Sequence, residues 1–143
     1  MLKSASGPDG SITYNYDELY RLKQVIDPYY NTTTYGYDEG NRRQTMTVSK
    51  TNEVYQYSYD SSNQLMSIDN NGTFNFEYDD FGRMNKKTMA NGTYTEFQSD
   101  HLGRLKELIN YNSNNSVISQ YLSQAGDFDM VGNRKKVTTL DIN

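Results

Sequence analysis

The sequence has no cysteine, no tryptophan, one histidine and two prolines among its 143 residues. Without cysteine there are no disulfides and no thiolate ligands for a metal. No apolar stretch is long enough to suggest a transmembrane helix, and nothing resembles a signal peptide. The net charge of −4 argues against nucleic acid as a main partner, because such a partner needs a basic stripe on the protein.

Hydrophobic residues make up only 34% of the chain, yet it contains 14 tyrosines and five phenylalanines. The apolar surface must therefore be built largely from aromatic rings. Residues 73–89 show how these rings are used. In TFNFEY, aromatic and polar residues alternate, as they do in a strand with one aromatic face. Asp79 and Gly82 then provide the residue types of a tight turn, and a second strand follows.

The same pattern of strand, aspartate turn and strand recurs along the chain at intervals of about twenty residues, which is the mark of a repeat architecture. The turn aspartates are Asp17, Asp38, Asp60, Asp79, Asp100 and Asp129. Some copies depart from the pattern. Tyr20 and Asn63 stand where the turn glycine is expected, and Gln64 stands where arginine is expected. The Asp38 turn, read with Gly40 as its glycine, is one residue short.

These repeats resemble the YD-repeat or RHS-repeat proteins, whose pattern is Tyr-x-Tyr-Asp-x-x-Gly-Arg-Leu. The best matches are FEYDDFGRM at residues 76–84 and DHLGRL at residues 100–105, and DMVGNR at residues 129–134 is similar to a Gly-Asn-Arg variant of the turn. The resemblance covers residues 13–140. It implies that the strands form part of a spiral β-shell around a hollow interior.

The pattern predicts an all-β fold of repeated antiparallel hairpins in a long twisted meander of about twelve strands. Residues 104–110 have some helical spacing, but the repeat context favours a strand. Two turn chemistries are expected to alternate: Asp-x-x-Gly at one end of the strands and Asn-Gly or a polar loop at the other. Residues 1–12 are predicted to be a flexible lead-in or an expression remnant, and residues 13–143 an array of about six repeats.

The repeated turn residues are expected to have structural roles, because catalysis needs one special pair of carboxylates rather than several equivalent ones. An arginine after each turn, as at Arg21 and Arg42, could bind acidic glycans. Pairing across strands or with the turn aspartate of a neighbouring repeat is favoured. The turn set is Asp17, Asp38, Gly40, Asp60, Asp79, Gly82, Arg83, Asp100, Gly103, Arg104, Asp129, Gly132 and Arg134.

No catalytic residue, metal site or cofactor is predicted. A catalytic triad would need a nucleophilic serine near His101, and the sequence has no nucleophile-elbow motif. His101 is therefore predicted to be a solvated turn residue. The tyrosines have two possible roles: they form the core of the sheet, which we favour, or they face solvent and stack on sugar rings. The residues concerned are Tyr14, Tyr16, Tyr35, Tyr37, Tyr55, Tyr57, Tyr59 and Tyr78.

The sequence thus favours a non-enzymatic structural module, a section of an extracellular or toxin-enclosing shell wall. The alternative is a module that binds carbohydrate at a cell surface through tyrosine and arginine. Expected partners are further repeats of a parent chain or another copy, which would pair with the open strand edges. The family resemblance implies a secreted or cell-surface bacterial protein.

Overall fold

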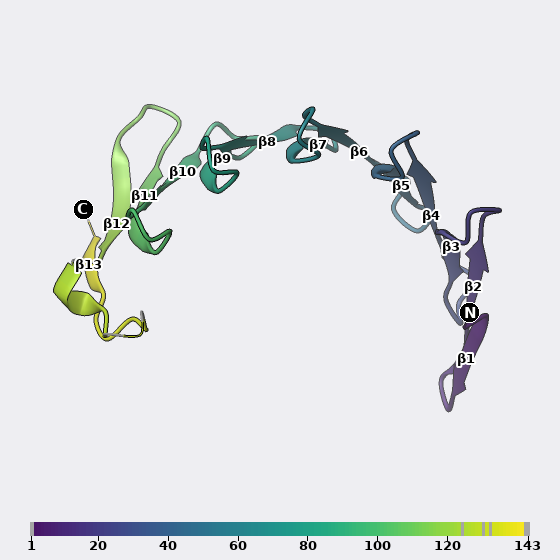
Figure 1. Ribbon diagram of the computed structural model, residues 1–143. Coiled ribbons are helices and arrows are strands. Elements are labelled where there is room, and N and C mark those ends of the chain that lie inside the picture. Colours follow the sequence, from purple (N-terminus) through teal and green to yellow (C-terminus); the bar gives the residue numbers. More distant parts are fainter. Residues whose placement is uncertain (1, 124, 130, 132, 142–143) are drawn as a thin grey trace. The chain divides into compact units, whose positions relative to one another are not determined.

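The computed structural model describes residues 2–123, 125–129, 131 and 133–141. The fold is all-β: thirteen strands and one short 3₁₀ helix, η1 (Ala125–Asp127), in the described part (Figure 1). The chain divides into two compact units, Met1–Asn71 and Gly72–Asn143, and each is described by itself.

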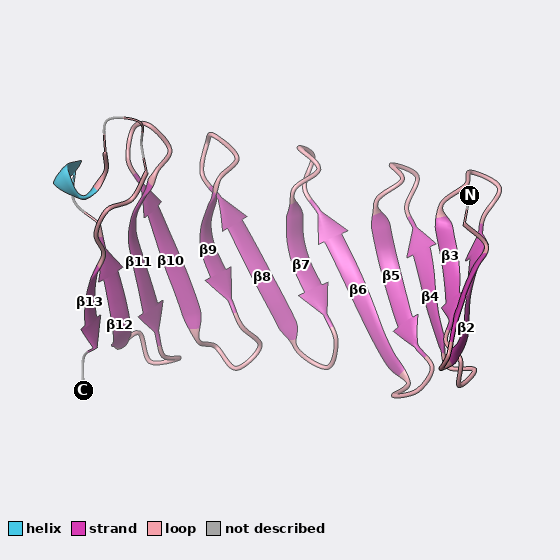
Figure 2. Cartoon of the chain, turned by 90° about the horizontal axis from the view of Figure 1, so that it is seen from below, coloured by secondary structure: helices cyan, strands magenta, loops and turns pink. Residues whose placement is uncertain are grey.

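In the first unit, each strand pairs with the next one along the chain in antiparallel orientation. Figure 2 shows consecutive strands of this unit joined by short turns at both ends. The predicted hairpin meander is confirmed. The strands are β1 (Ser4–Gly7), β2 (Gly10–Tyr16), β3 (Leu22–Ile26), β4 (Thr32–Tyr37), β5 (Arg43–Val48), β6 (Glu53–Tyr59) and β7 (Leu65–Asp69).

The second unit repeats this arrangement, and its strands also pair in chain order. Residues 105–111 form a strand, as the repeat context predicted, rather than a helix. The strands are β8 (Thr73–Tyr78), β9 (Met84–Thr88), β10 (Tyr94–Ser99), β11 (Leu105–Tyr111), β12 (Val117–Leu122) and β13 (Thr138–Asp141).

The prediction of a flexible lead-in at residues 1–12 is corrected by the structure. Ser4–Gly7 forms β1, which pairs with β2 through a register from Ser4↔Thr13 to Gly7↔Gly10. Pro8 and Asp9 form the connection, and Gly10 has a φ of 117°. A Pro-Asp-Gly stretch marks a turn as readily as a linker, so the same residues that suggested a lead-in close a hairpin.

A β-bulge follows every turn of the Asp-x-x-Gly type between β2 and β11. Tyr37 pairs with Arg43, whereas Gly36 pairs with Thr45, so Gln44 is the extra residue. The bulged residue is left unpaired, so the alternation of side chains between the two faces shifts by one residue. The residue before the aspartate therefore lies on the same face as the residue five positions after the aspartate. We call this the aromatic face, since it carries the alternating tyrosines and phenylalanines.

The tyrosines do not form a closed core. Within the part of the chain that the structure describes, no hydrophobic side chain is fully buried, and Ser123 is the one buried polar residue, at 5% exposure. All the tyrosines of the predicted core set are half-buried. The core prediction is therefore wrong in degree: neighbours within the sheet flank the rings, but no second layer covers them in the described residues.

Candidate functional site

The repeated unit of this chain is a five-residue turn that starts at an aspartate, which we call the Asp turn. In the copy that starts at Asp79, the Asp79 N–H donates to the Arg83 carbonyl and the Gly82 N–H donates to the Asp79 carbonyl, both at 2.9 Å. The carboxylate closes the turn. Its Oδ1 accepts from the N–H groups of Phe81 and Arg83, and its Oδ2 accepts from Arg83 Nε at 2.7 Å.

The same hydrogen bonds recur in the other copies. Oδ1 of Asp17, Asp60 and Asp100 accepts from the N–H groups two and four positions later. A side chain of this geometry satisfies backbone donors that a sharp turn leaves unpaired. The structure thus places these aspartates in turns, where their carboxylates accept backbone N–H groups.

The Asp38 turn is not one residue short. Asp38 N–H donates to the Arg42 carbonyl, and Asn41 N–H donates to the Asp38 carbonyl, as in the other copies. Asn41, with a φ of 62°, holds the left-handed position. Gly40 is two residues after the aspartate and is not the turn glycine. Asparagine tolerates the left-handed region, which is why the register was misread from the glycine alone.

In the last copy, Asn133 rather than Arg134 holds the arginine position. The Asn133 N–H and side-chain amide donate to the two oxygens of Asp129 at 2.7 and 3.0 Å. Arg134 instead donates to the Leu105 carbonyl at 3.3 Å. Gly132, predicted as part of this turn, lies outside the described residues.

Sequence reasoning missed further copies at the opposite ends of the strands. Asp27 accepts from Tyr29, Asn31 and the Asn31 amide in the same pattern. Asn112 accepts from the N–H groups of Asn114 and Ser116 at 2.9 Å. The signal was present as an Asp or Asn five residues before the first residue of the next strand, without the Gly-Arg that drew attention to the others.

The expected contrast between two turn chemistries is also corrected. The Asn91-Gly92 hairpin is not a two-residue turn. Met89 N–H donates to the Thr93 carbonyl, and Gly92 N–H donates to the Met89 carbonyl, which is the backbone of the Asp turn without its carboxylate. The β9–β10 turn therefore has the same backbone as the Asp turns at the other end of the strands. The β5–β6 turn does not, because Val48 pairs with Glu53 across only four residues.

Each turn arginine pairs with the aspartate of its own turn, not with that of a neighbouring repeat. Arg42 Nε lies 2.7 Å from Asp38 Oδ2, and the same pairing joins Arg21 to Asp17. In the second unit, Arg83 pairs with Asp79 and Arg104 with Asp100. The predicted pairing with a neighbouring aspartate is therefore wrong. The aspartate four residues earlier in the same turn already lies within ion-pair distance of the guanidinium.

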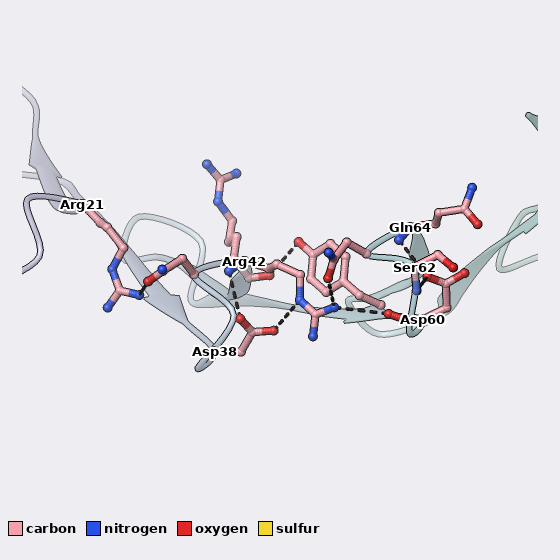
Figure 3. Close-up of polar contacts among 10 residues, drawn as sticks. Arg21, Asp38, Arg42, Asp60, Ser62 and Gln64 are labelled. Carbon is pink, nitrogen blue, oxygen red and sulfur yellow. Dashed lines mark hydrogen bonds and ion pairs between the residues drawn. The ribbon is translucent and has the colours of Figure 1, made fainter. Parts of the chain in front are cut away.

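The arginine then reaches onward to the next repeat. Figure 3 shows Arg42 between Asp38 and the Asp60 turn. Arg42 Nη1 donates to the Asp60 carbonyl at 3.2 Å and to Asn63 Oδ1 at 2.8 Å, and its guanidinium lies 4.8 Å from the Tyr59 ring centroid. One side chain therefore joins two successive turns by an ion pair, hydrogen bonds and a cation–π contact.

Other arginines make the same link. Arg21 Nη1 donates to Asn41 Oδ1 at 2.7 Å, and its guanidinium lies 4.5 Å from the Tyr37 ring centroid. In the second unit, Arg83 donates to the Asp100 carbonyl at 3.4 Å, and Arg104 lies 4.2 Å from the Phe128 ring centroid. These contacts connect residues about one repeat apart.

The tyrosines before the Asp38 and Asp60 turns are held in place by their hydroxyl groups. Tyr37 donates to the Leu22 carbonyl and Tyr59 to the Arg43 carbonyl, both at 2.8 Å. Because these rings face a guanidinium and their hydroxyls are bonded, they bind the sheet together rather than offering a free surface. The prediction of sugar stacking gains no support from them.

The hydrogen bonds of the turn lower the pKa of its carboxyl groups. The Asp38 pKa is lowered by the backbone N–H of Arg42 and then by its side chain. For Asp79 the order is reversed, with the Arg83 side chain first. Burial raises the pKa of Asp17 and Asp100, but the donors outweigh it and the net direction is down. The side chain of Asn31 is the first cause of the lowered pKa of Asp27.

A cavity of about 620 Å³ lies in the second unit near the Asp100 turn. His101, Lys106 and Phe128 are among its lining residues, together with the buried Ser123. Arg104 and Asp100 also line it but are already joined as an ion pair. No cluster of three or more metal-ligating side chains occurs in the described residues. None of the described helices could cross a membrane.

Comparison with known proteins agrees with the repeat pattern. Residues 59–94 match the RHS Repeat family, so the resemblance stated above is confirmed over these residues. The matched region includes the Asp60 and Asp79 turns. No curated protein matches the chain.

Solved structures show the same fold. In "Crystal Structure of TcdB2-TccC3-TEV", the match covers 91% of this chain at 15% identity with a TM-score of 0.71. In "Crystal Structure of TcdB2-TccC3-Cdc42", it covers 78% at 12% identity with a TM-score of 0.62. The matched regions are 8% and 7% of those longer chains, so this chain spans less than a tenth of their length.

Proposed function

From the RHS repeat at residues 59–94, we propose that this chain is a section of the wall of a YD- or RHS-type β-shell and has no enzymatic activity of its own. The observation that carries the proposal is the arginine link between successive turns, represented by Arg42. The link uses the repeated residues to hold each repeat to the next. Residues that serve every repeat in the same way build a wall rather than a single reaction centre.

The partners of such a section are further repeats of a longer parent chain or another copy of it. In the described residues, β1 pairs with β2 and β13 pairs with β12, so one edge of each end strand is open. An open edge presents backbone N–H and C=O groups that favour pairing with another strand. The RHS repeat and the fold shared with the TcdB2-TccC3 structures support a secreted or cell-surface bacterial location for the parent protein.

The test is the mass of the purified chain by light scattering over a range of concentrations, with a circular dichroism melt on the same samples. A wall section with open edges is expected to associate as its concentration rises. The variant Ala5→Lys, which places a charge on the β1 edge strand, should reduce the association. Ser61→Lys, in an exposed turn, is the matched control and should not.

A chain that stays monomeric at every concentration and melts cooperatively would contradict the proposal, because it would be an autonomous module. Association that Ala5→Lys leaves unchanged would remove the β1 edge from the proposal. It would leave the β13 edge to be tested by Thr139→Lys.

A further inference from the structure

Arg43 occupies a position that is apolar in the other repeats between β2 and β11. This is the residue five positions after the turn aspartate, which the bulge places on the aromatic face. Tyr37 pairs with Arg43 in the same way that Tyr16 pairs with Leu22 and Tyr59 with Leu65. The corresponding residues elsewhere are Leu22, Leu65, Met84 and Leu105. Arg43 therefore places a cation at a position that is aliphatic in the other repeats, on a face that also carries Glu53 in the first unit and Lys87 in the second.

Two tyrosine rings hold the Arg43 guanidinium. Its Cζ lies 4.7 Å from the centroid of the Tyr35 ring and 5.9 Å from that of Tyr57. Both rings therefore contact the guanidinium, whose N–H donors lie in its own plane. The two contacts place the group between neighbouring strands of the first unit.

The charge of Arg43 has no protein counterion in the described residues. Each arginine of an Asp-x-x-x-Arg turn lies within 2.7 Å of its own aspartate, as Arg42 does of Asp38. No ion pair or side-chain hydrogen bond joins Arg43 to another described residue, and its side chain is exposed. The Tyr35 hydroxyl likewise has no hydrogen-bond partner in the described part. The donors of Arg43 therefore have no acceptor among the described residues, and its guanidinium lies over the Tyr35 ring.

The chemistry of this site favours a carboxylate. Two parallel N–H donors of a guanidinium match the two oxygens of a carboxylate. The nearest neighbour in sequence, Arg42, is already committed to Asp38, so a single positive charge is available and a singly charged anion balances it.

The surroundings favour a peptide over a sugar. Met46 lies opposite both Tyr35 and Tyr55 on the same face, and Val48 lies one step further along the strand. These side chains are apolar, so they suit a carboxylate with apolar neighbours better than a ligand rich in hydroxyl groups. The guanidinium also lies against the ring faces on which a sugar would stack.

We propose that Arg43, held between Tyr35 and Tyr57, is a carboxylate-binding site for an extended acidic peptide segment that lies on the aromatic face of the first unit. This inference goes beyond the proposed function and does not depend on it, because it uses contacts within one unit. Such a site gives one repeat of the array a recognition role in addition to its structural role.

The experiment follows the Arg43 Nε–Hε signal in the NMR spectrum of the full 143-residue chain labelled with ¹⁵N. The signal is assigned by its loss in Arg43→Leu. The probe is a blocked peptide, Leu-Glu-Val-Glu-Leu, and its isosteric control has glutamine in place of both glutamates. We expect the glutamate peptide to shift the signal and the glutamine peptide to leave it unchanged. Higher salt should weaken the effect because the site is exposed.

Two variants sharpen the test. Arg43→Leu installs the residue found at the matching positions, so it should fold like the parent by circular dichroism and bind the peptide roughly ten-fold more weakly. Leu22→Arg places a guanidinium between Tyr14 and Tyr35 in a matching setting and should add a second shifting side-chain signal. Both effects are expected on peptide binding, whereas the association of the chain through its edges should stay unchanged.

The proposal is overturned if the glutamate peptide causes no shift, if the glutamine peptide shifts the signal equally, or if Arg43→Leu binds as tightly as the parent. A shift with oligogalacturonate but not with the glutamate peptide would also overturn it, because the carboxylate would then belong to a sugar. Failure of Leu22→Arg to bind additional peptide would show that a guanidinium between two such rings is not sufficient. None of these results would change the association test of the shell proposal.

Discussion

The two units of the chain fill the left-handed position of the Asp turn with different residues. In the first unit, this position is held by Tyr20, Asn41 and Asn63, with φ values of 62°, 62° and 65°. In the Asp79 and Asp100 turns of the second unit, Gly82 and Gly103 hold it, with φ values of 78° and 79°, whereas Asn115 holds it in the Asn112 turn at 63°. The backbone hydrogen bonds of the turn are the same in both units. The turn is therefore set by its aspartate, and the fourth residue is free to vary.

The difference changes how one repeat is joined to the next. Where asparagine holds the position, its Oδ1 accepts from the preceding arginine, as Asn63 does from Arg42 at 2.8 Å. Where glycine holds it, the side-chain acceptor is missing and the arginine has only the backbone carbonyl of the next turn, to which Arg42 also donates. Arg83 Nη1 donates to the Asp100 carbonyl at 3.4 Å and lies 3.5 Å from the place where a Cβ on Gly103 would stand. Compared with glycine, asparagine fits the left-handed backbone less easily, but its side chain adds a hydrogen bond between repeats.

Acidification should have the largest effect on both units. The pKa values of Asp17, Asp27, Asp38, Asp79 and Asp100 are all lowered in the folded chain from an ordinary 3.8. A lowered pKa contributes stability that is present above the ordinary value and is lost as the pH falls through the folded value. The melting temperature should therefore stay level above about pH 5 and fall steadily below about pH 4. Circular dichroism melts at a series of pH values measure this.

A flat profile down to pH 2.5 would contradict the role of these carboxylates. The control is Asp38→Asn, which keeps an Oδ1 acceptor, as Asn112 does in its own turn, but does not titrate. This variant should make the fall on acidification shallower.

Removing one turn carboxylate should have the next largest effect. Asp38→Ala in the first unit removes the acceptor of the Arg42 N–H and guanidinium. Asp79→Ala in the second removes the acceptor of two backbone N–H groups and the Arg83 guanidinium. We expect each variant to melt several degrees below the parent. A lower melting temperature in only one of the two variants would show that the turns of the two units are not equivalent. Glu39→Ala, at an exposed position in the same turn, is the matched control and should melt like the parent.

Changing the fourth residue should have a smaller destabilising effect, whose size depends on the substitution. Gly103→Val forces a β-branched residue to a φ of 79° and should cost about 1–3 kcal/mol of unfolding free energy. Gly103→Asn should cost less than about 1 kcal/mol, because its side chain can accept from Arg83 as Asn63 does from Arg42. Urea unfolding of both variants against the parent measures the difference. Equal losses would mean that the inter-repeat hydrogen bond contributes nothing.

Much of the fold was predictable from the sequence. The alternation of aromatic and polar residues predicted the strands, and the recurrence of aspartate predicted the hairpins and their antiparallel order. The Asp27 and Asn112 turns were missed because they lack the Gly-Arg signature, although the carboxylate or amide performs the same task there. The strand at Ser4–Gly7 was missed because short polar residues beside proline and glycine carry little periodicity.

The candidate sites were less predictable. The arginines were recognised, but not their partners. The sequence placed Arg43 after Arg42 without showing that the bulge turns it onto the aromatic face beside Tyr35 and Tyr57. A single shift of the alternation moves a side chain to the opposite face, and only the backbone shows where that shift occurs.

The sequence by itself determined the repeat, the strands and the closure of each Asp turn, because these depend on contacts within about five residues of chain. Only the tertiary structure decided how the repeats are joined and that Arg43 has no carboxylate partner in the described residues. Arg42 meets Asn63 across 21 residues, and Arg21 meets Asn41 across 20. Such contacts exist only once the strands between them are paired and their register is fixed. The registers of β4 with β5 and of β5 with β6 therefore determine that Arg43 lies between two rings without a carboxylate of its own.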